Sequence, residues 1–135
     1  MTSSPEQLVR KWFEDIWNHH RLETIDELMD ETCVIHDPGT IPGDIRRPAD
    51  FRAIATALHD AFSDLHVEIE DVLADGERVV IRCLVTGTAR ATKRPIRISG
   101  MAWGRWHNGK LVEGWNNFDL LSMYEQIGAL ERPSI

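Results

Sequence analysis

The chain has 135 residues, of which 42% are hydrophobic and 27% charged, and this length fits one domain over residues 1–135 with a core at about 7–130. Fifteen Lys and Arg residues stand against twenty-two Asp and Glu residues, for a formal charge of −7. A surface with this excess of negative charge repels phosphate backbones, so no nucleic-acid partner is expected. No apolar run approaches the roughly 20 residues that cross a bilayer, and the N-terminus lacks a secretory signal, so we expect no membrane contact and a cytoplasmic protein.

The first predicted element is an amphipathic helix that begins at a capping signal. Ser4 is placed as the N-cap, Pro5 occupies the first helical position, and Gln7 can reach back to the cap. One face of the helix is apolar and consists of Leu8, Val9, Trp12, Phe13, Ile16 and Trp17. This face is expected to lie in the core.

Two further helices and a short strand follow. The spacing of apolar residues predicts a short helix over 22–29 and a longer one over 48–62. A strand is expected over 33–36 between them. The Pro- and Gly-rich stretch 37–48 then predicts a loop, which is long enough to fold over a neighbouring part of the protein.

After residue 64 the pattern changes from helical to alternating. Asp75-Gly76 and Asn108-Gly109 are strong hairpin-turn signals. A closing helix is expected over 120–130, with Gly128 as its cap. The four strands are predicted over about 65–75, 78–91, 96–107 and 110–119.

This order of elements predicts an α+β fold with an antiparallel sheet. Because sheets twist and the helices must cover one face, the sheet is expected to curl into a cone with a pocket, covered by three N-terminal helices and closed by a short C-terminal helix. The strand at 78–91 is apolar on both faces, so one set of its apolar side chains would be exposed to solvent in a monomer. We therefore expect a homodimer through the back of the sheet.

The last strand carries the clearest candidate for chemistry. Alternation places Glu113, Trp115, Asn117 and Asp119 on one face and Val112, Gly114, Asn116 and Phe118 on the other. If the first face is turned into the cone, Asp119 is a candidate general acid/base, because partial desolvation would raise its pKa. The alternative is that Asp119 is the N-cap of the closing helix.

The neighbouring strand places Met101, Trp103 and Arg105 on one face. Arg105 could hold an anionic or enolate oxygen, or it could pair with Glu113 across the hairpin. Arg82 interrupts an apolar strand, and a structural ion pair is the preferred interpretation.

His36, at the end of the first strand, is either an acid/base partner or a locally hydrogen-bonded side chain. The spacings typical of protein-bound metals are absent, and so are the Gly-rich cofactor loops and the serine-hydrolase pattern. Cys33 and Cys83 are expected to be small core residues. These observations leave chemistry without a cofactor or metal, or plain binding.

Several stretches together resemble a known family over nearly the whole chain. They are Ile35-His36-Asp37-Pro38, Phe51-Arg52, Ala61-Phe62-Ser63-Asp64-Leu65, residues 75–82, Thr86-Gly87-Thr88, and 109–121 with 126–130. The chain is similar in these stretches to the SnoaL-like polyketide cyclase family, and the resemblance implies the cone fold of the nuclear transport factor two-like superfamily. Many relatives carry a His after the Gly-Thr pair, where this chain has Ala89.

The resemblance implies an activity as well. Relatives use a pocket Asp as the acid/base in an intramolecular aldol ring closure of a polyketide ester, without cofactor or metal. Asp119 is the position that fits this motif, His36 matches a recurrent pocket-region His, and Arg82 and Arg105 match recurrent arginines.

The first hypothesis is therefore a cyclase, lyase or isomerase acting on a small apolar or polyketide-like carbonyl compound. Asp119 would remove a proton, and His36, Asn117 or Arg105 would stabilise the enolate. The expected pocket walls are Trp17, Met101, Trp103 and Trp115. A non-catalytic ligand-binding or dimeric assembly module, and a hydrolase or dehydratase that holds water at Asp119, are the alternatives.

Overall fold

Ten elements build the computed structural model, which describes residues 3–37 and 43–134. They are α1 (Pro5–Phe13), η1 (Glu14–Asn18), α2 (Glu23–Leu28), β1 (Met29–His36), α3 (Pro48–Ala61), β2 (Phe62–Asp75), β3 (Arg78–Ala89), β4 (Pro95–His107), β5 (Lys110–Phe118) and α4 (Leu120–Gln126). The strands form one sheet in the order β1-β5-β4-β3-β2. The predicted α+β fold is confirmed, including all four helices.

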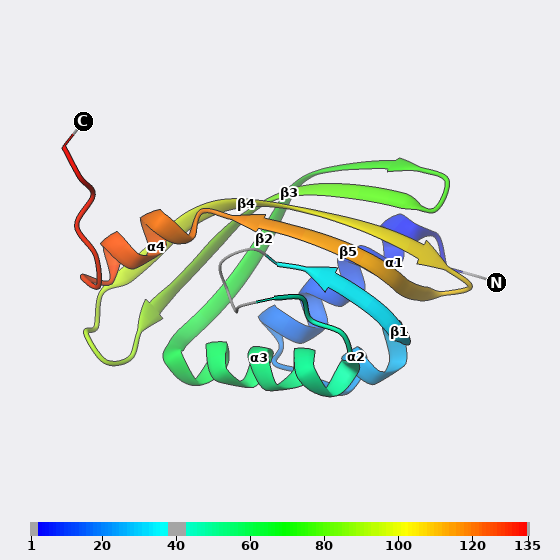
Figure 1. Cartoon of the computed structure of the whole chain (residues 1–135), viewed down its shortest axis with the longest axis horizontal. Helices are drawn as coiled ribbons and strands as arrows, with labels where there is room; N and C mark the ends of the chain where they lie inside the picture. Colours follow the sequence, from blue (N-terminus) through cyan, green and yellow to red (C-terminus); the bar gives the residue numbers. More distant parts are fainter. Residues whose placement is uncertain (1–2, 38–42, 135) are drawn as a thin grey trace.

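The sheet arches over α1, α2 and α3, which lie together against its concave face (Figure 1). α4 lies at the far end of β4 and β5 and makes its contacts with β4. One feature departs from the expected antiparallel sheet, because β1 pairs with β5 in parallel. The two strands are far apart in sequence, so no tight turn forces them to run in opposite directions. Below, "outer face" means the side of the sheet that α1, α2 and α3 do not cover.

The start of α1 is formed as predicted. The Ser4 hydroxyl accepts a hydrogen bond from the Gln7 amide, and the Gln7 side chain accepts one from the Ser4 amide. The helix was expected to continue in one form through Trp17, but it changes at Glu14 into a π-helical turn. His59 Nε2 on α3 donates to the Ile16 carbonyl at 2.8 Å, which satisfies a carbonyl in this irregular turn.

We expect His59 to make the stability of the fold sensitive to acid. Burial is the main cause that lowers its pKa, so the folded protein holds it neutral. The unfolded chain then binds the extra proton, and the free energy of unfolding falls as pH drops from about 6.5 through the folded pKa. Urea unfolding at about pH 7.5 and about pH 5.5 should show a smaller acid-dependent loss in His59→Gln than in the wild type. An equal loss in both proteins would refute this role.

The strand boundaries agree with the sequence patterns to within a few residues. Asn108 and Gly109 both have positive φ, 50° and 77°, as the predicted tight turn requires. The closing helix ends at Gln126, earlier than expected, and Gly128 follows in the left-handed region with φ 82°. β1 is longer than predicted and begins at Met29.

The core lies between the helices and the concave face of the sheet. Cys33 and Cys83 are fully buried in it as predicted, and burial raises the pKa of both thiols to about 12. Both are therefore unreactive packing residues. Among the helices that the structure describes, none has the length and apolarity needed to cross a membrane.

Candidate functional site

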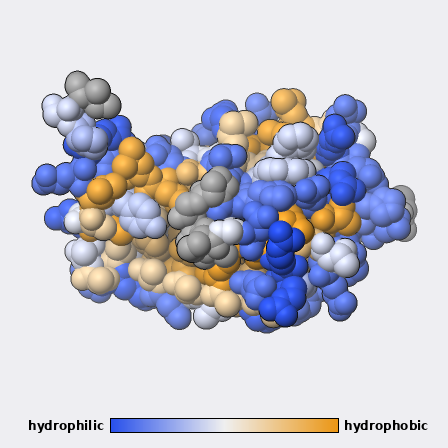
Figure 2. Space-filling model, viewed as in Figure 1, coloured by the Kyte–Doolittle hydropathy of each residue, from blue (hydrophilic) through white to orange (hydrophobic). Residues whose placement is uncertain are grey.

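A cavity of about 210 Å³ lies between the concave face of the sheet and the helices. Its walls are apolar apart from a few groups. The aromatic residues that line it are Trp12, Phe13, Trp17, Phe51, Phe62, Trp103, Trp106, Phe118 and Tyr124. Leu58, Leu120 and Tyr124 line it at the end of the molecule where apolar side chains gather over α4 and across to α3 (Figure 2).

The sequence of β4 and β5 explains the hollow. The concave side of these strands carries small residues where a packed sheet would carry large ones: Gly100, Ala102, Gly104 and Gly114. Ala102, Gly104 and Gly114 line the cavity directly. Because alternate side chains on these strands are missing or short, the helices cannot fill the space under the curved sheet.

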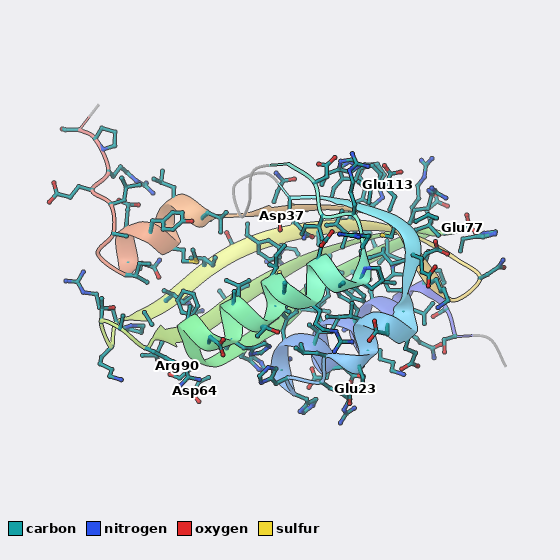
Figure 3. The ribbon with its side chains drawn as sticks, turned by 60° about the horizontal axis from the view of Figure 1, so that its bottom comes forward. Glu23, Asp37, Asp64, Glu77, Arg90 and Glu113 are labelled. Carbon is teal, nitrogen blue, oxygen red and sulfur yellow. The ribbon has the colours of Figure 1, made fainter. Side chains whose placement is uncertain are left out.

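Asp37 is the one acidic residue that lines the cavity among the described residues. It follows β1 directly and is 9% exposed. The Asn116 amide on β5 donates to Asp37 Oδ2 at 3.5 Å, a long hydrogen bond that joins the only two carboxylate or amide side chains on the described part of this wall. Figure 3 shows Asp37 near the centre of the molecule, with Glu113 farther along toward the β4–β5 turn.

The expectation that Asp119 lies in the pocket is not met, and the capping alternative is the one that the structure shows. Asp119 is exposed and is the N-cap of α4. Its carboxylate accepts from the Ser122 amide at 3.1 Å and from the Ser122 hydroxyl at 2.8 Å. These hydrogen bonds, the one to the hydroxyl foremost, lower the pKa of Asp119, which is opposite to the shift expected for a general base.

The face of β5 that was expected to turn inward is the outer face. Gly114, Asn116 and Phe118 line the cavity instead. Trp115 and Asn117 sit in register with Trp103 and Met101 on β4, and none of Trp115, Asn117 or Met101 reaches the cavity. The physical reason is that both faces of β5 carry aromatic residues, so hydrophobicity could not decide between them.

Two expected wall residues do border the cavity. Trp17 lines it from η1 and packs edge-on against Phe51, with ring centroids 6.0 Å apart. Trp103 also borders it, but its side chain lies on the outer face, where its ring is tilted against that of Trp115 with centroids 4.9 Å apart.

The remaining predicted site residues lie outside the cavity. His36 Nε2 contacts Glu113 Oε2 at 2.9 Å, and its ring stacks on Trp115. Arg105 pairs with Glu113 at 3.8 Å, as the ion-pair alternative predicted. Arg82 pairs with Glu70 at 2.9 Å across the β2–β3 hairpin, so the structural interpretation of this arginine is confirmed.

Asp37 and Asn116 are the polar cavity residues that sequence reasoning missed. A partial signal was present in β1, where Ile35 is apolar and His36, the next residue, is polar. Continuing that alternation by one step places Asp37 on the same side as Ile35. For Asn116 the sequence offered no comparable signal, because both faces of β5 carry aromatic residues.

The described residues hold no group of three His, Cys, Asp or Glu side chains that could bind a metal ion. Residues 38–42 of the expected loop lie outside the described residues.

The sequence model of the SnoaL-like polyketide cyclase family matches residues 7–127. The chain belongs to this family. Among solved structures, this SnoaL-like chain is similar to IdmH, a candidate polyketide cyclase from Streptomyces antibioticus, with 25% identity, a TM-score of 0.83, and coverage of 93% of this chain and 99% of that one. No curated protein is significantly similar to it.

Two more distant structures support the fold alone. A candidate SnoaL-like polyketide cyclase from Jannaschia sp. CCS1 is 18% identical, with a TM-score of 0.83 and coverage of 94% of this chain and 93% of that one. A protein with a ketosteroid isomerase-like fold from Catenulispora acidiphila is 16% identical, with a TM-score of 0.82 and coverage of 97% and 100%. The SnoaL-like chain therefore has the ketosteroid isomerase-like fold.

Proposed function

We propose that this protein is a cofactor-independent cyclase of the SnoaL-like family, acting on a polyketide-like carbonyl compound, with Asp37 as its acid/base. The observation that carries the proposal is a buried carboxylate in the wall of a cavity that is otherwise almost entirely apolar. A carboxylate beside a carbonyl compound in such a site is a suitable group for moving a proton at carbon.

The proposed reaction is an intramolecular aldol addition, in which the proton taken from carbon is later given to the new alkoxide oxygen. The Asp37 carboxylate removes a proton from the carbon next to a carbonyl group, and the resulting enolate carbon attacks a second carbonyl of the same molecule. A carbon–carbon bond forms, the second carbonyl becomes an alkoxide, and the Asp37 carboxyl group returns the proton to that oxygen. Asn116, already within reach of Asp37, is placed to donate its amide hydrogen to the enolate oxygen.

The cavity walls suit a flat, largely apolar substrate. Aromatic side chains such as Trp12, Trp17 and Phe51 border it, and rings stack favourably on such walls. An apolar lining also excludes water, which strengthens each hydrogen bond made inside. This chemistry favours a polyketide chain that already carries one or more fused rings.

The direct test is incubation of the purified protein with a panel of β-polyketone esters bearing zero to three fused rings. Ring closure is followed by the change in absorbance, and NMR identifies the product, which has the same mass as the substrate. Binding is followed separately by quenching of tryptophan fluorescence, since Trp12, Trp17 and Trp106 border the cavity. Ring closure faster than the buffer reaction supports the proposal, and its absence for every ester that binds contradicts it.

A non-catalytic receptor for the same class of ligand is the second candidate. It is favoured by the position of Asp119, the residue that matches the family motif, which caps α4 outside the cavity. Binding of the esters without any turnover would support this candidate over the first.

We also propose that a second copy of the chain covers the outer face of the sheet. Met101 and Trp103 are 50% and 41% exposed there. The same face carries both signs of charge, with Arg82 paired to Glu70 and Arg105 to Glu113. A face that carries both signs of charge can pack against its own copy without net repulsion. A partner surface with charges of a single sign would find opposite charges at only half of these positions.

Sedimentation of the wild type at micromolar concentration is expected to give a dimer. Met101→Glu places a charge in the middle of the outer face and should give a folded monomer, because the replaced side chain is exposed. Leu121→Glu is the matched control, since Leu121 is 44% exposed, belongs to α4 and to no strand of the sheet, and is outside the cavity lining. A wild-type monomer, or a dimer that persists in Met101→Glu, contradicts this arrangement.

A further inference from the structure

Five charged side chains form an alternating chain across the end of β1. Arg105 on β4 pairs with Glu113 on β5 at 3.8 Å, and Glu113 pairs with His36 Nε2 at 2.9 Å. The other ring nitrogen, Nδ1, pairs with Asp44 at 3.3 Å, and Asp44 pairs with Arg46 at 3.4 Å. His36 is therefore the central link, with one carboxylate on each side of its ring.

A backbone bridge lies at the same place in the fold, beside Asp37. Ile35 and Ile45 form a two-way bridge, with Ile35 N donating to Ile45 O at 2.7 Å and Ile45 N donating to Ile35 O at 2.9 Å. His36 and Asp44 are the neighbours of these two residues, so their ion pair lies directly beside the bridge. Asp37 is the next residue along β1 and lines the cavity.

The protonation state of the ring decides whether both contacts hold. An imidazolium ion has two N–H donors and can serve Glu113 and Asp44 at once. A neutral imidazole has one donor, so its other nitrogen would present a lone pair to a carboxylate. The ring also stacks on Trp115, with centroids 5.2 Å apart, which fixes its plane toward both carboxylates.

We propose that His36 is a positioning residue, which as an imidazolium ion ties Asp44 to Glu113 and thereby fixes the backbone that aims Asp37 into the cavity. The link between Asp44 and Glu113 through His36 is independent of the proposed function. Its effect on turnover rests on the proposed function. His36 lies on the opposite side of the sheet from the cavity, so it acts through Asp37 and touches no substrate.

The direction of the pH dependence follows from the groups around the ring. The hydrogen bond to Glu113 is the main cause that raises the pKa of His36, and Asp44 adds to it, while burial opposes it. Arg105 and Arg46 face the two carboxylates from their far sides. A group with a raised folded pKa contributes its full stabilisation below its unfolded value of about 6.5 and loses it as pH rises through the folded pKa.

The first experiment needs no substrate. NMR titration of the His36 ring should give a pKa above that of a free histidine, and Glu113→Gln and Asp44→Asn should each lower it. Hydrogen exchange of the Ile35 and Ile45 amides, corrected for intrinsic rates, should lose about tenfold in protection above the His36 pKa, the size expected for one charge-assisted hydrogen bond. His36→Gln should show the lower protection at every pH.

His107→Gln is the matched control. His107 also pairs with a glutamate, Glu77, but it lies beside the β4–β5 turn and outside the cavity lining. It should leave the protection of the two amides unchanged. Protection that does not change with pH in the wild type, or that falls equally in both variants, overturns the proposal.

The second experiment uses any ester that the protein turns over. The wild-type kcat should fall on the alkaline side of the His36 pKa, and His36→Gln should lose this limb while His107→Gln keeps it. If no ester is turned over, the proposed function fails and the titration and exchange results stand by themselves. If turnover occurs but its alkaline limb survives in His36→Gln, the positioning role fails and the function stands.

Discussion

Asp37→Asn is expected to lower kcat for ring closure by about 10²- to 10⁴-fold, the usual contribution of a general acid/base. The substitution keeps the size of the side chain and its hydrogen bonding capacity toward Asn116, but the amide cannot take a proton from carbon. Binding of the ester should therefore change little. Single-turnover kinetics measures the loss, and tryptophan fluorescence measures the affinity.

Asp119→Asn is the control for this prediction. Asn is as good an N-cap as Asp, so α4 should remain formed and turnover should stay within about twofold of the wild type. The pair of variants decides between the carboxylate in the cavity and the carboxylate that the family motif indicates. Normal turnover in Asp37→Asn, or a large loss in Asp119→Asn, would refute the assignment of Asp37.

Gly100→Ala is expected to have the largest effect on stability among small substitutions near the cavity. A Cβ atom at this position would lie 2.1 Å from Phe118 Cδ1 and 2.9 Å from Phe118 Cγ. The ring of Phe118 faces Gly100 across the β4–β5 pair and lines the cavity. The added methyl group therefore forces either this ring into the cavity or the two strands apart. Overpacking of this kind costs about 1–3 kcal/mol of the free energy of unfolding.

A double-mutant cycle isolates this contact. Urea unfolding of Gly100→Ala, Phe118→Ala and the double variant should show that the double variant is more stable than the sum of the single losses predicts, by about 1–2 kcal/mol. Ester affinity should fall in Gly100→Ala, because the displaced ring occupies the cavity, and should recover in the double variant. Simple additivity would mean that the Phe118 ring relaxes without cost.

Much of the fold follows from local chemistry that can be read along the chain. The capping residues Ser4 and Gln7 set the start of α1, and Asn108-Gly109 sets the last hairpin, because each signal acts through its own backbone. The change to a π-helical turn at Glu14 could not be predicted in this way. The turn receives a hydrogen bond at the Ile16 carbonyl from His59, 43 residues away, and no local signal contains this contact.

The candidate site was only half predictable for a similar reason. Alternation separated Trp115 from Asn116, and family resemblance predicted a pocket, but the face of β5 expected in the cavity, that of Trp115 and Asn117, is the outer face. That choice depends on where α1, α2 and α3 pack, and both faces of β5 offer aromatic surface to them. By itself, the sequence determined most of the elements and their order, because these depend on local backbone preferences and on hydrophobic periodicity, and its motifs carried the resemblance to the family. Only the tertiary structure decided that Asp37 faces the cavity and Asp119 caps a helix, because a period of two defines two faces of a strand and packing alone selects the buried one.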